Sequence, residues 1–283
     1  MRSRLIPWIT ACFFVCLPAW GQQLVTVRGS AVVARALAVA APILEKEHGI
    51  QINFVAEISG LETADKLGRD VFDIALYTRK MTGEERALRP EKSFIETLVG
   101  KQAILIVVPD QVWRSGVRAL TKEQLRKIYE REITNWKSVG GEDREIVYFN
   151  REVGRGVWDL YMIFLYGDVR RAPLSKAEVL TNSDDVRTAV EFNGGSISLL
   201  EHGELKGDRV HALGIKLPDG TVADPTPLNI GSGRYELSRP LYFVTAKQPT
   251  GKVRDLIEFM LSPKGQECVQ QAGHVPLATL KLK

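Results

Sequence analysis

Short apolar runs of strand length alternate with amphipathic helical segments at the start of this chain, and this alternation restricts the fold more than any other feature. The runs Leu24–Val27, Ile50–Val55 and Val71–Leu76 read as strands, while Ala31–His48 and Leu61–Leu67 read as helices. The order strand, helix, strand, helix, strand predicts a largely parallel sheet with helices on both faces, which is an α/β fold.

The rest of the chain continues the alternation. Ala103–Val108 reads as a buried strand, and Thr121 as the N-cap of a helix that runs to about Glu130. Further along we expect strands at Ile146–Phe149, Ser196–Leu200 and Leu241–Thr245, helices at Val157–Tyr166, Gly251–Leu261 and Pro263–Ala272, and a loop-rich stretch from Leu217 to Gly233.

The first 21 residues have the pattern of a cleavable signal peptide. Arg2 and Arg4 precede an apolar run, Leu5–Trp20, and Ala19-Trp20-Gly21 gives the small-x-small pattern that places maturation at Gln22. The apolar run is too short for a membrane anchor. Ile9–Cys12 is similar to a lipoprotein cleavage box, but Cys12 comes early and the run continues past it, so we expect a soluble protein exported to the periplasm.

Composition narrows the class of partner. Removing Arg2 and Arg4 takes two basic side chains from the 38 in the chain and none of the 34 acids, which leaves a formal charge of +2. This balance argues against nucleic acid as a partner. Cys268 is the one thiol outside the signal segment, so we expect no disulfide and no cysteine-based metal site. The sequence implies no cofactor.

A turn that contains Arg151 and two glycines has the chemistry of an anion site. It lies between the expected strand Ile146–Phe149 and the expected helix from Val157, and Gly154 and Gly156 permit close approach to the backbone. Free N–H groups, the positive end of the helix dipole and the Arg151 guanidinium would then face one ligand. The alternative is a surface turn held by an ordinary arginine ion pair.

Two further turns share this position between a strand and a helix. They are Gly29-Ser30 and Ser59-Gly60, and with Gly154-Arg155-Gly156 they lie where open α/β sheets bind ligands. Three helix N-termini that converge on one cleft would hold an oxyanion well. The alternative, that all three are only tight connections, stays open at this point.

Several motifs in order give the chain a family resemblance. They are Leu120-Thr121-Lys122-Glu123-Gln124-Leu125, Ile133-Thr134-Asn135-Trp136 with Val139-Gly140-Gly141, the Arg151 turn, the strand with its glycine at Gly194–Leu199, Ser238-Arg239-Pro240-Leu241-Tyr242 and the tail Leu261–Leu277. With these motifs the chain resembles the PstS-like phosphate-binding periplasmic proteins, which are substrate-binding proteins of ABC transporters.

The resemblance implies a bilobed type II periplasmic-binding-protein fold with a ligand cleft between two α/β lobes. Lobe 1 would comprise residues 22–107 and 240–283, and lobe 2 residues 108–239. The lobes would close over a small inorganic oxyanion, with phosphate expected, and the protein, a monomer, would deliver it to an ABC transporter permease.

The resemblance also implies a set of site residues, with some departures. The candidates are Ser30, Ala31, Ser59, Gly60, Thr78, Arg79, Arg151, Gly154, Arg155 and Gly156. Val32 and Val33 stand where the family often has a threonine and an apolar residue, and Gly154-Arg155-Gly156-Val157 replaces its Gly-Ser-Gly-Thr, so hydroxyl donors are lost. Arg155 would either compensate for them, point outward or fill the cleft. Arg79 stands where some phosphate binders have a proton-accepting acid.

No motif in the sequence supports a catalytic function. The chain lacks a GxSxG elbow, an HExxH motif and a glycine-lysine phosphate loop, and its four histidines are scattered. We therefore expect a binding protein and not an enzyme. Two hypotheses remain: a transport receptor for a small oxyanion, or a sensor or interaction module whose altered pocket no longer binds phosphate.

Overall fold

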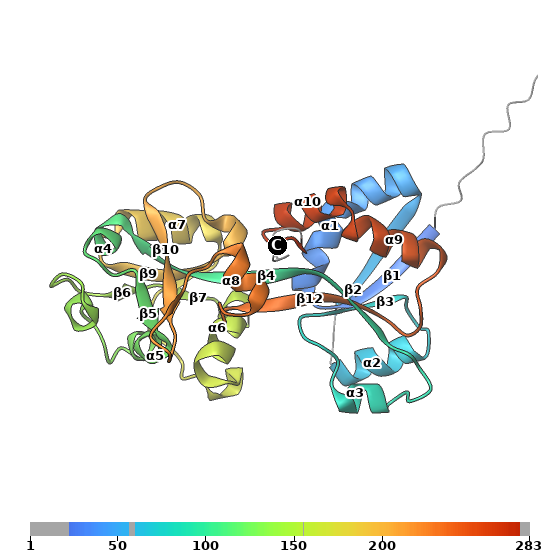
Figure 1. Ribbon diagram of the computed structural model, residues 1–283, viewed down its shortest axis with the longest axis horizontal. Coiled ribbons are helices and arrows are strands. Elements are labelled where there is room, and N and C mark those ends of the chain that lie inside the picture. The colour runs from blue at the N-terminus through green and yellow to red at the C-terminus, as the bar shows by residue number, and fades with distance from the viewer. Residues whose placement is uncertain (1–22, 57–59, 155, 278–283) are drawn as a thin grey trace, which may run out of the picture.

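The structure is a computed structural model and describes residues 23–56, 60–154 and 156–277. The expected signal peptide, Ser59 and Arg155 lie outside the described residues. The chain forms two α/β lobes that are joined by two long strands, β4 (Ile95–Pro109) and β12 (Ser238–Thr245) (Figure 1). The two-lobed α/β fold predicted from the sequence is therefore confirmed.

Lobe 1 contains five neighbouring strands of the ten-stranded sheet that the described residues form, with helices on both faces. Its strand order is β2-β1-β3-β12-β4, where β1 is Gln23–Gly29, β2 is Ile50–Ala56 and β3 is Ile74–Tyr77. β1 pairs in parallel with β2 and β3, as predicted. The complete sheet is mixed, because β12 runs antiparallel to both β3 and β4. The expectation of a largely parallel sheet therefore holds for the first three strands only.

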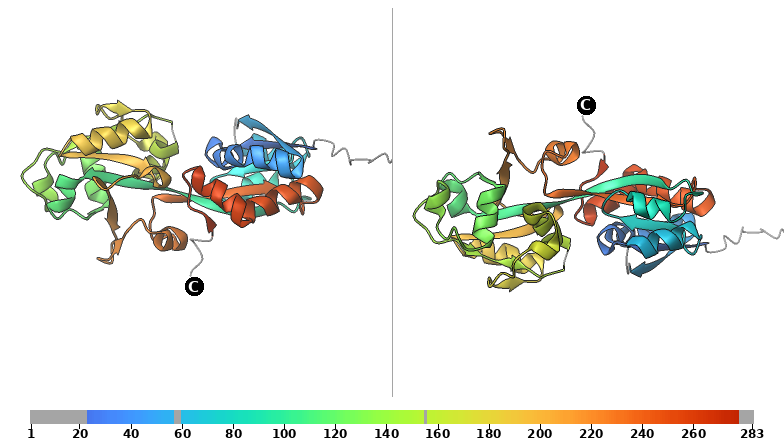
Figure 2. Two further views of the ribbon diagram at one scale, coloured as in Figure 1. Left: turned by 90° about the horizontal axis from the view of Figure 1, so that it is seen from above. Right: turned by 90° about the horizontal axis from the view of Figure 1, so that it is seen from below.

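The helices of lobe 1 lie on opposite sides of this sheet (Figures 1 and 2). α1 (Ala31–His48), α9 (Gly251–Leu261) and α10 (Pro263–Gln271) share one apolar cluster with β1. α2 (Gly60–Gly68) belongs to a second cluster on the other side, and α3 (Gly83–Ala87) packs against it. The C-terminal helices thus complete the lobe that the N-terminal strands begin.

Lobe 2 is built around the second half of β4. This strand pairs antiparallel with β9 (Ser196–Glu201) and β10 (Val210–Lys216). α7 (Ser183–Phe192) covers one face of the sheet, and the large cluster around Trp136 fills the other, where Trp136 Nε1 donates to the carbonyl of Gly195 at 2.8 Å. The remaining elements are α4 (Asp110–Arg114), β5 (Ala119–Thr121), α5 (Lys122–Tyr129), β6 (Val147–Tyr148), β7 (Asn150–Arg151), α6 (Gly156–Tyr166), β8 (Val179–Leu180), β11 (Val222–Ala223) and α8 (Pro227–Ser232), with short 3-10 turns at Trp136–Val139, Val169–Arg171 and His202–Glu204.

The capping signal at Thr121 correctly placed the start of α5. The Thr121 hydroxyl accepts from Gln124 N at 3.1 Å while Gln124 Oε1 accepts from Thr121 N at 2.9 Å, which is the predicted capping box. The expected loop-rich stretch 217–233 contains β11 and α8, which were not predicted. β10 was also missed, since Gly214 and His211 interrupt its apolar pattern.

Along β4 and β12, the buried residues change from the apolar cluster of one lobe to that of the other. Val99 and Leu241 belong to the cluster of lobe 1, whereas Ala103 and Leu237 belong to the cluster of lobe 2. We therefore propose that the crossover on β4 lies between Val99 and Ala103, a few residues before the 107/108 boundary expected from the sequence.

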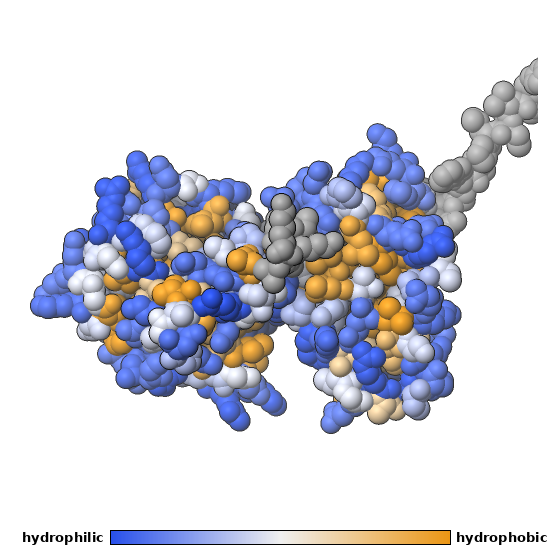
Figure 3. All heavy atoms as spheres, in the orientation of Figure 1, coloured by the Kyte–Doolittle hydropathy of each residue, from blue (hydrophilic) through white to orange (hydrophobic). Residues whose placement is uncertain are grey.

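The surface fits a solvated two-lobed molecule. On the face shown in Figure 3, hydrophilic residues cover most of both lobes, apolar residues form scattered patches, and a notch separates the lobes. Among the helices of the described residues, none has both the length and the apolar composition needed to cross a membrane.

Candidate functional site

A cavity of about 550 Å³ lies between the lobes and is lined by residues of both. Lobe 1 contributes the first turn of α1, lobe 2 contributes the start of α6 and the start of α7, and β12 contributes one arginine. The lining residues are Ser30, Ala31, Val32, Arg35, Arg151, Gly154, Gly156, Val157, Asp159, Thr181, Asn182, Ser183, Glu201, Glu204 and Arg239. Five of the ten residues expected at the site are in this set.

Arg151 is fixed in the wall of the cavity and does not face bulk water. It is 6% exposed, and its Nη1 and Nη2 donate to the carbonyls of Asn182 at 3.1 Å and Thr181 at 3.3 Å. Its own N–H donates to Asn150 Oδ1 at 2.9 Å. The two carbonyls orient the guanidinium at the wall of the cavity.

The first turns of α1 and α6 meet across the cavity. Ser30 is the N-cap of α1, and its hydroxyl makes no capping hydrogen bond. A Cβ added to Gly156 would lie 2.9 Å from the Val32 side chain, so the missing side chain lets the two helix starts approach each other. Two of the three helix N-termini expected at the site are therefore brought together at the cavity.

The third expected N-terminus lies elsewhere. Gly60 starts α2, but its carbonyl accepts from Tyr77 Oη at 3.2 Å and it does not line the cavity. The start of α7, at Asn182 and Ser183, takes the third position instead. Ser59, the hydroxyl expected beside Gly60, lies outside the described residues.

Thr78 and Arg79 line a different hollow, together with Lys122 and Phe164. Arg79 makes a bidentate pair with Glu85, both contacts at 2.7 Å, and Glu85 is 1% exposed. The Arg79 charge is therefore engaged within lobe 1. Thr78 and Arg79 therefore do not line the cavity that contains Arg151.

A chain of polar contacts crosses from one lobe to the other beside the cavity. Arg35 of α1 donates Nη1 and Nη2 to the two carboxylate oxygens of Glu201 at 2.7 and 2.8 Å. Gln102 of β4 donates Nε2 to Glu201 at 3.0 Å and accepts from Arg239 Nε at 2.8 Å. Sequence reasoning missed Arg35 and Glu201, while Arg239 was quoted within the Ser238–Tyr242 motif without a role.

Three acidic side chains, Asp159, Glu201 and Glu204, also line the cavity. Glu204 pairs with Arg187 at 3.4 Å and Lys206 at 4.0 Å. Asp159, in the first turn of α6, has no ion pair within the described part of the chain. Burial raises the pKa of Asp159 above its ordinary value, while the positive charge of Arg239 acts in the opposite direction.

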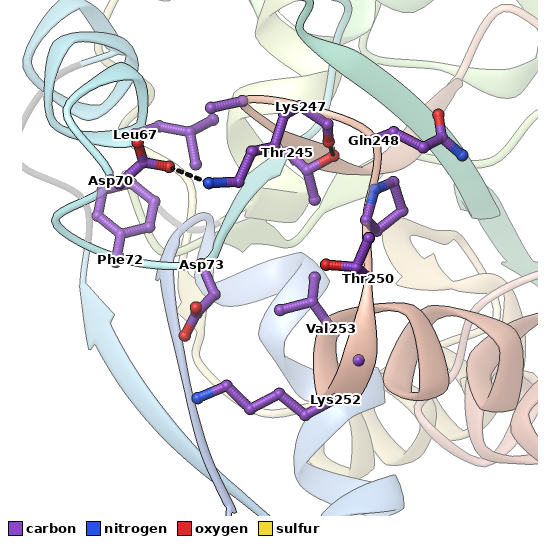
Figure 4. Close-up of a pocket in the computed structure, with 13 residues that line it drawn as sticks. Leu67, Asp70, Phe72, Asp73, Thr245, Lys247, Gln248, Thr250, Lys252 and Val253 are labelled. Carbon is purple, nitrogen blue, oxygen red and sulfur yellow. Dashed lines mark hydrogen bonds and ion pairs between the residues drawn. The ribbon is translucent and has the colours of Figure 1, made fainter.

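A second cavity, of about 490 Å³, lies on lobe 1 away from these residues and is shown in Figure 4. Its charged side chains already have partners: Asp70 pairs with Lys247 at 3.2 Å and Lys92 at 2.7 Å, Asp73 accepts from Thr26 N at 2.8 Å, and Lys252 donates to the carbonyl of Leu24. Asp70 is thus neutralised by two lysines, whereas Asp73 and Lys252 hydrogen-bond to backbone groups.

Within residues 23–56, 60–154 and 156–277, no group of three or more His, Cys, Asp or Glu side chains could hold a metal ion. The interlobe cavity is lined by three arginines, three carboxylates, hydroxyl side chains and the starts of α1, α6 and α7. The guanidinium groups, hydroxyls and helix starts suit a small oxyanion.

The fold and this site define a periplasmic-binding-protein class of molecule, and the family comparison agrees. The chain belongs to the PBP superfamily: the family model described as a PBP superfamily domain matches residues 18–264.

The comparisons also give more particular relatives. The chain is 26% identical over 284 residues to the phosphate-binding protein PstS of Borreliella burgdorferi, an alignment that covers 95% of this chain and 96% of the relative. It is similar to the crystal structure of an ABC-type phosphate transport receptor from Vibrio cholerae, with a TM-score of 0.68, 25% identity and coverage of 89% and 99%. A possible phosphate-binding protein from Planctomyces limnophilus shares the fold, with a TM-score of 0.75, 21% identity and coverage of 92% and 95%.

Proposed function

We propose that this protein is the solute-binding protein of an ABC transporter, and that it captures a small oxyanion, phosphate, outside the cytoplasm. The observation that carries the proposal is the interlobe cavity, where the buried Arg151 and the first turns of α1 and α6 face one space. The names of the relatives in Borreliella burgdorferi and Vibrio cholerae support phosphate as the ligand and transport as the role.

The finer parts of the proposal follow from this assignment. The protein acts as a monomer in the periplasm, passes its ligand to a membrane permease and catalyses no reaction. Closure of the two lobes about β4 and β12 buries the anion, because two connecting strands permit a hinge motion. A sensor or interaction module with an emptied pocket is the alternative, but the buried Arg151 in the cavity wall gives it no support.

Calorimetric titration of the protein comprising residues 22–283 tests the proposal. Phosphate should bind saturably at one site, and small-angle scattering should record a more compact molecule when phosphate is present. Sulfate and organic phosphates serve as comparison ligands. Absence of binding by every one of these anions would leave the alternative as the better account.

Changing Val157 to threonine should strengthen phosphate binding by about tenfold, since a hydrogen bond to a charged group contributes about 1.5–3 kcal/mol. Val157 lines the cavity at the start of α6 and is buried, and threonine has almost the same shape with a hydroxyl added. Val117→Thr is the matched control, because Val117 is buried in the same apolar cluster but lies outside the cavity. Equal affinities in Val157→Thr and wild type would remove Val157 from the site.

A further inference from the structure

Arg239 occupies an unusual place between the lobes. It lies on β12, directly opposite Gln102 of β4, where the two connecting strands pair. Its side chain is partly buried and lines both the interlobe cavity and the neighbouring hollow of Thr78 and Arg79. A guanidinium at this position is central to the hinge and also accessible from the cavity.

The hydrogen-bond partners of Arg239 are neutral. Its Nε donates to Gln102 Oε1 at 2.8 Å and its Nη2 to the carbonyl of Gly156 at 3.4 Å. Across the described residues, no carboxylate lies within 4.0 Å of this guanidinium; Asp159 and Glu201 influence it only from farther away. A guanidinium has five N–H donors, so most of its donors remain for another acceptor.

Placing a cation in a partly buried position without a counter-ion is unfavourable. Consistent with this, burial lowers the pKa of the Arg239 guanidinium from its ordinary value. In Arg35 the same side-chain type is satisfied by a bidentate carboxylate, Glu201. The two arginines are linked through Gln102, and one of them lacks the anion that the other has.

The start of α6 lies close to Arg239. A Cβ added to Gly156 would lie 2.7 Å from Arg239 Nη2, which a real side chain would not tolerate without a shift. The first residues of this 11-residue helix and Arg151 border the same cavity. An anion in this cavity would therefore meet two guanidinium groups and a helix N-terminus.

We propose that Arg239 is a second guanidinium ligand for the oxyanion held by Arg151, and that the anion supplies the counter-charge that Arg239 lacks. This inference rests on the proposed function and names a residue of the same site. It favours a small oxyanion with two negative charges, such as the phosphate dianion, over a monoanion. Because Arg239 contacts Gln102, the anion would also act on the polar chain that reaches Glu201 and Arg35 across the lobes.

A purely structural role for Arg239 and a role in anion binding predict different melting temperatures for the ligand-free variant. If Arg239 only braced the two connecting strands, its replacement would lower the melting temperature and leave affinity unchanged. If it awaits an anion, Arg239→Gln should keep or raise the melting temperature of the ligand-free protein, because an uncompensated cation is removed. The same variant should weaken phosphate binding by about 10- to 100-fold.

The experiment measures phosphate Kd and ligand-free melting temperature for wild type, Arg239→Gln and Arg239→Lys. Arg234→Gln is the control for the change in net charge, since Arg234 is exposed and its Nη2 donates to Thr221 Oγ1 at 2.6 Å, outside the cavity. The slope of log Kd against log salt should fall in Arg239→Gln and stay close to the wild-type slope in Arg239→Lys and Arg234→Gln.

A Kd at least tenfold above the wild-type value, with no loss of ligand-free melting temperature relative to Arg234→Gln, supports the proposal. A smaller rise in Kd, or one that comes with a lower melting temperature, overturns it. If Arg239→Gln does not fold, Arg239→Lys decides, because loss of the planar fork should raise Kd at least threefold and a wild-type Kd overturns the role. No phosphate binding by the wild-type protein would overturn the proposed function too, whereas wild-type-like binding by both variants overturns only the role of Arg239.

Discussion

Replacing Arg151 by methionine is expected to weaken phosphate binding by at least about 100-fold. Each hydrogen bond between a charged donor and a charged acceptor contributes about 1.5–3 kcal/mol, and a guanidinium can make two to one oxyanion. Every 1.4 kcal/mol corresponds to about a factor of ten in Kd. Arg151 is buried in the cavity wall and already oriented by the carbonyls of Thr181 and Asn182, so it pays little ordering entropy when it binds.

The methionine variant should remain folded with a modest loss of stability. It leaves the carbonyls of Thr181 and Asn182 without their donor, which costs about 1–2 kcal/mol in unfolding free energy. Arg151→Lys should bind with an intermediate Kd, because the charge is kept and the planar fork is lost. Arg170→Met controls for net charge, since Arg170 is exposed and pairs with Asp168 away from the cavity.

Calorimetry with phosphate measures these affinities directly, and urea denaturation of the ligand-free variants measures their stability. A Kd for Arg151→Met within threefold of that for Arg170→Met would show that the anion lies elsewhere. The hollow lined by Thr78 and Arg79 would then be the next candidate site.

Local sequence chemistry predicted the turn that forms the lobe 2 side of the candidate site. A strand, a turn with two glycines and an apolar helix are fixed by neighbouring residues, so the turn from Arg151 to Gly156 could be recognised without knowledge of the fold. Gly154, at a φ of +80°, adopts the left-handed conformation that such a turn requires. Ser30 could be predicted for the same reason, because it is the N-cap of α1.

The cross-lobe contacts could not be predicted in this way. Arg35 and Glu201 are 166 positions apart, and Gln102 and Arg239 are 137 apart. Such pairs depend on how two lobes are joined, and no local pattern of charge or hydrophobicity encodes that geometry. The motif that contains Arg239 marked the residue, but only the paired strands β4 and β12 explain why it faces the cavity.

The placement of Arg79 shows a local signal that was overlooked. Thr82 and Glu85 form a capping box, in which Thr82 Oγ1 accepts from Glu85 N at 3.2 Å and Glu85 Oε2 accepts from Thr82 N at 2.7 Å. This pattern of a threonine followed three residues later by a glutamate is visible in the sequence. It fixes a buried carboxylate close to Arg79 and so directs that guanidinium away from the interlobe cavity.

Acid should destabilise the ligand-free protein through His274. This side chain is 1% exposed, and its Nε2 donates to the carbonyl of Val32 in the first turn of α1 at 3.0 Å. Burial lowers the pKa of His274 from its ordinary 6.5 to about 4; Arg35 and Arg239 act in the same direction, and the contact with Val32 and the charge of Glu201 oppose it. The folded protein therefore holds the imidazole neutral under conditions where the unfolded chain would protonate it.

The sign of the effect follows from proton binding. Between these two pKa values the unfolded chain binds one more proton than the folded protein, so the unfolding free energy rises with pH. The contribution of His274 is fully present above pH 6.5 and is lost as the pH falls towards about 4, which at about 1.4 kcal/mol per pH unit amounts to about 3 kcal/mol.

Urea denaturation at a series of pH values from about 7 to about 4 measures this loss for wild type and for His274→Gln. Glutamine keeps an N–H donor for the Val32 carbonyl and does not titrate, so the variant should lose about 3 kcal/mol less than wild type over this range. Titration of Asp159 and other shared groups cancels in the comparison. Parallel pH profiles for the two proteins would contradict the prediction and would mean that His274 reaches water readily enough to protonate in the folded state.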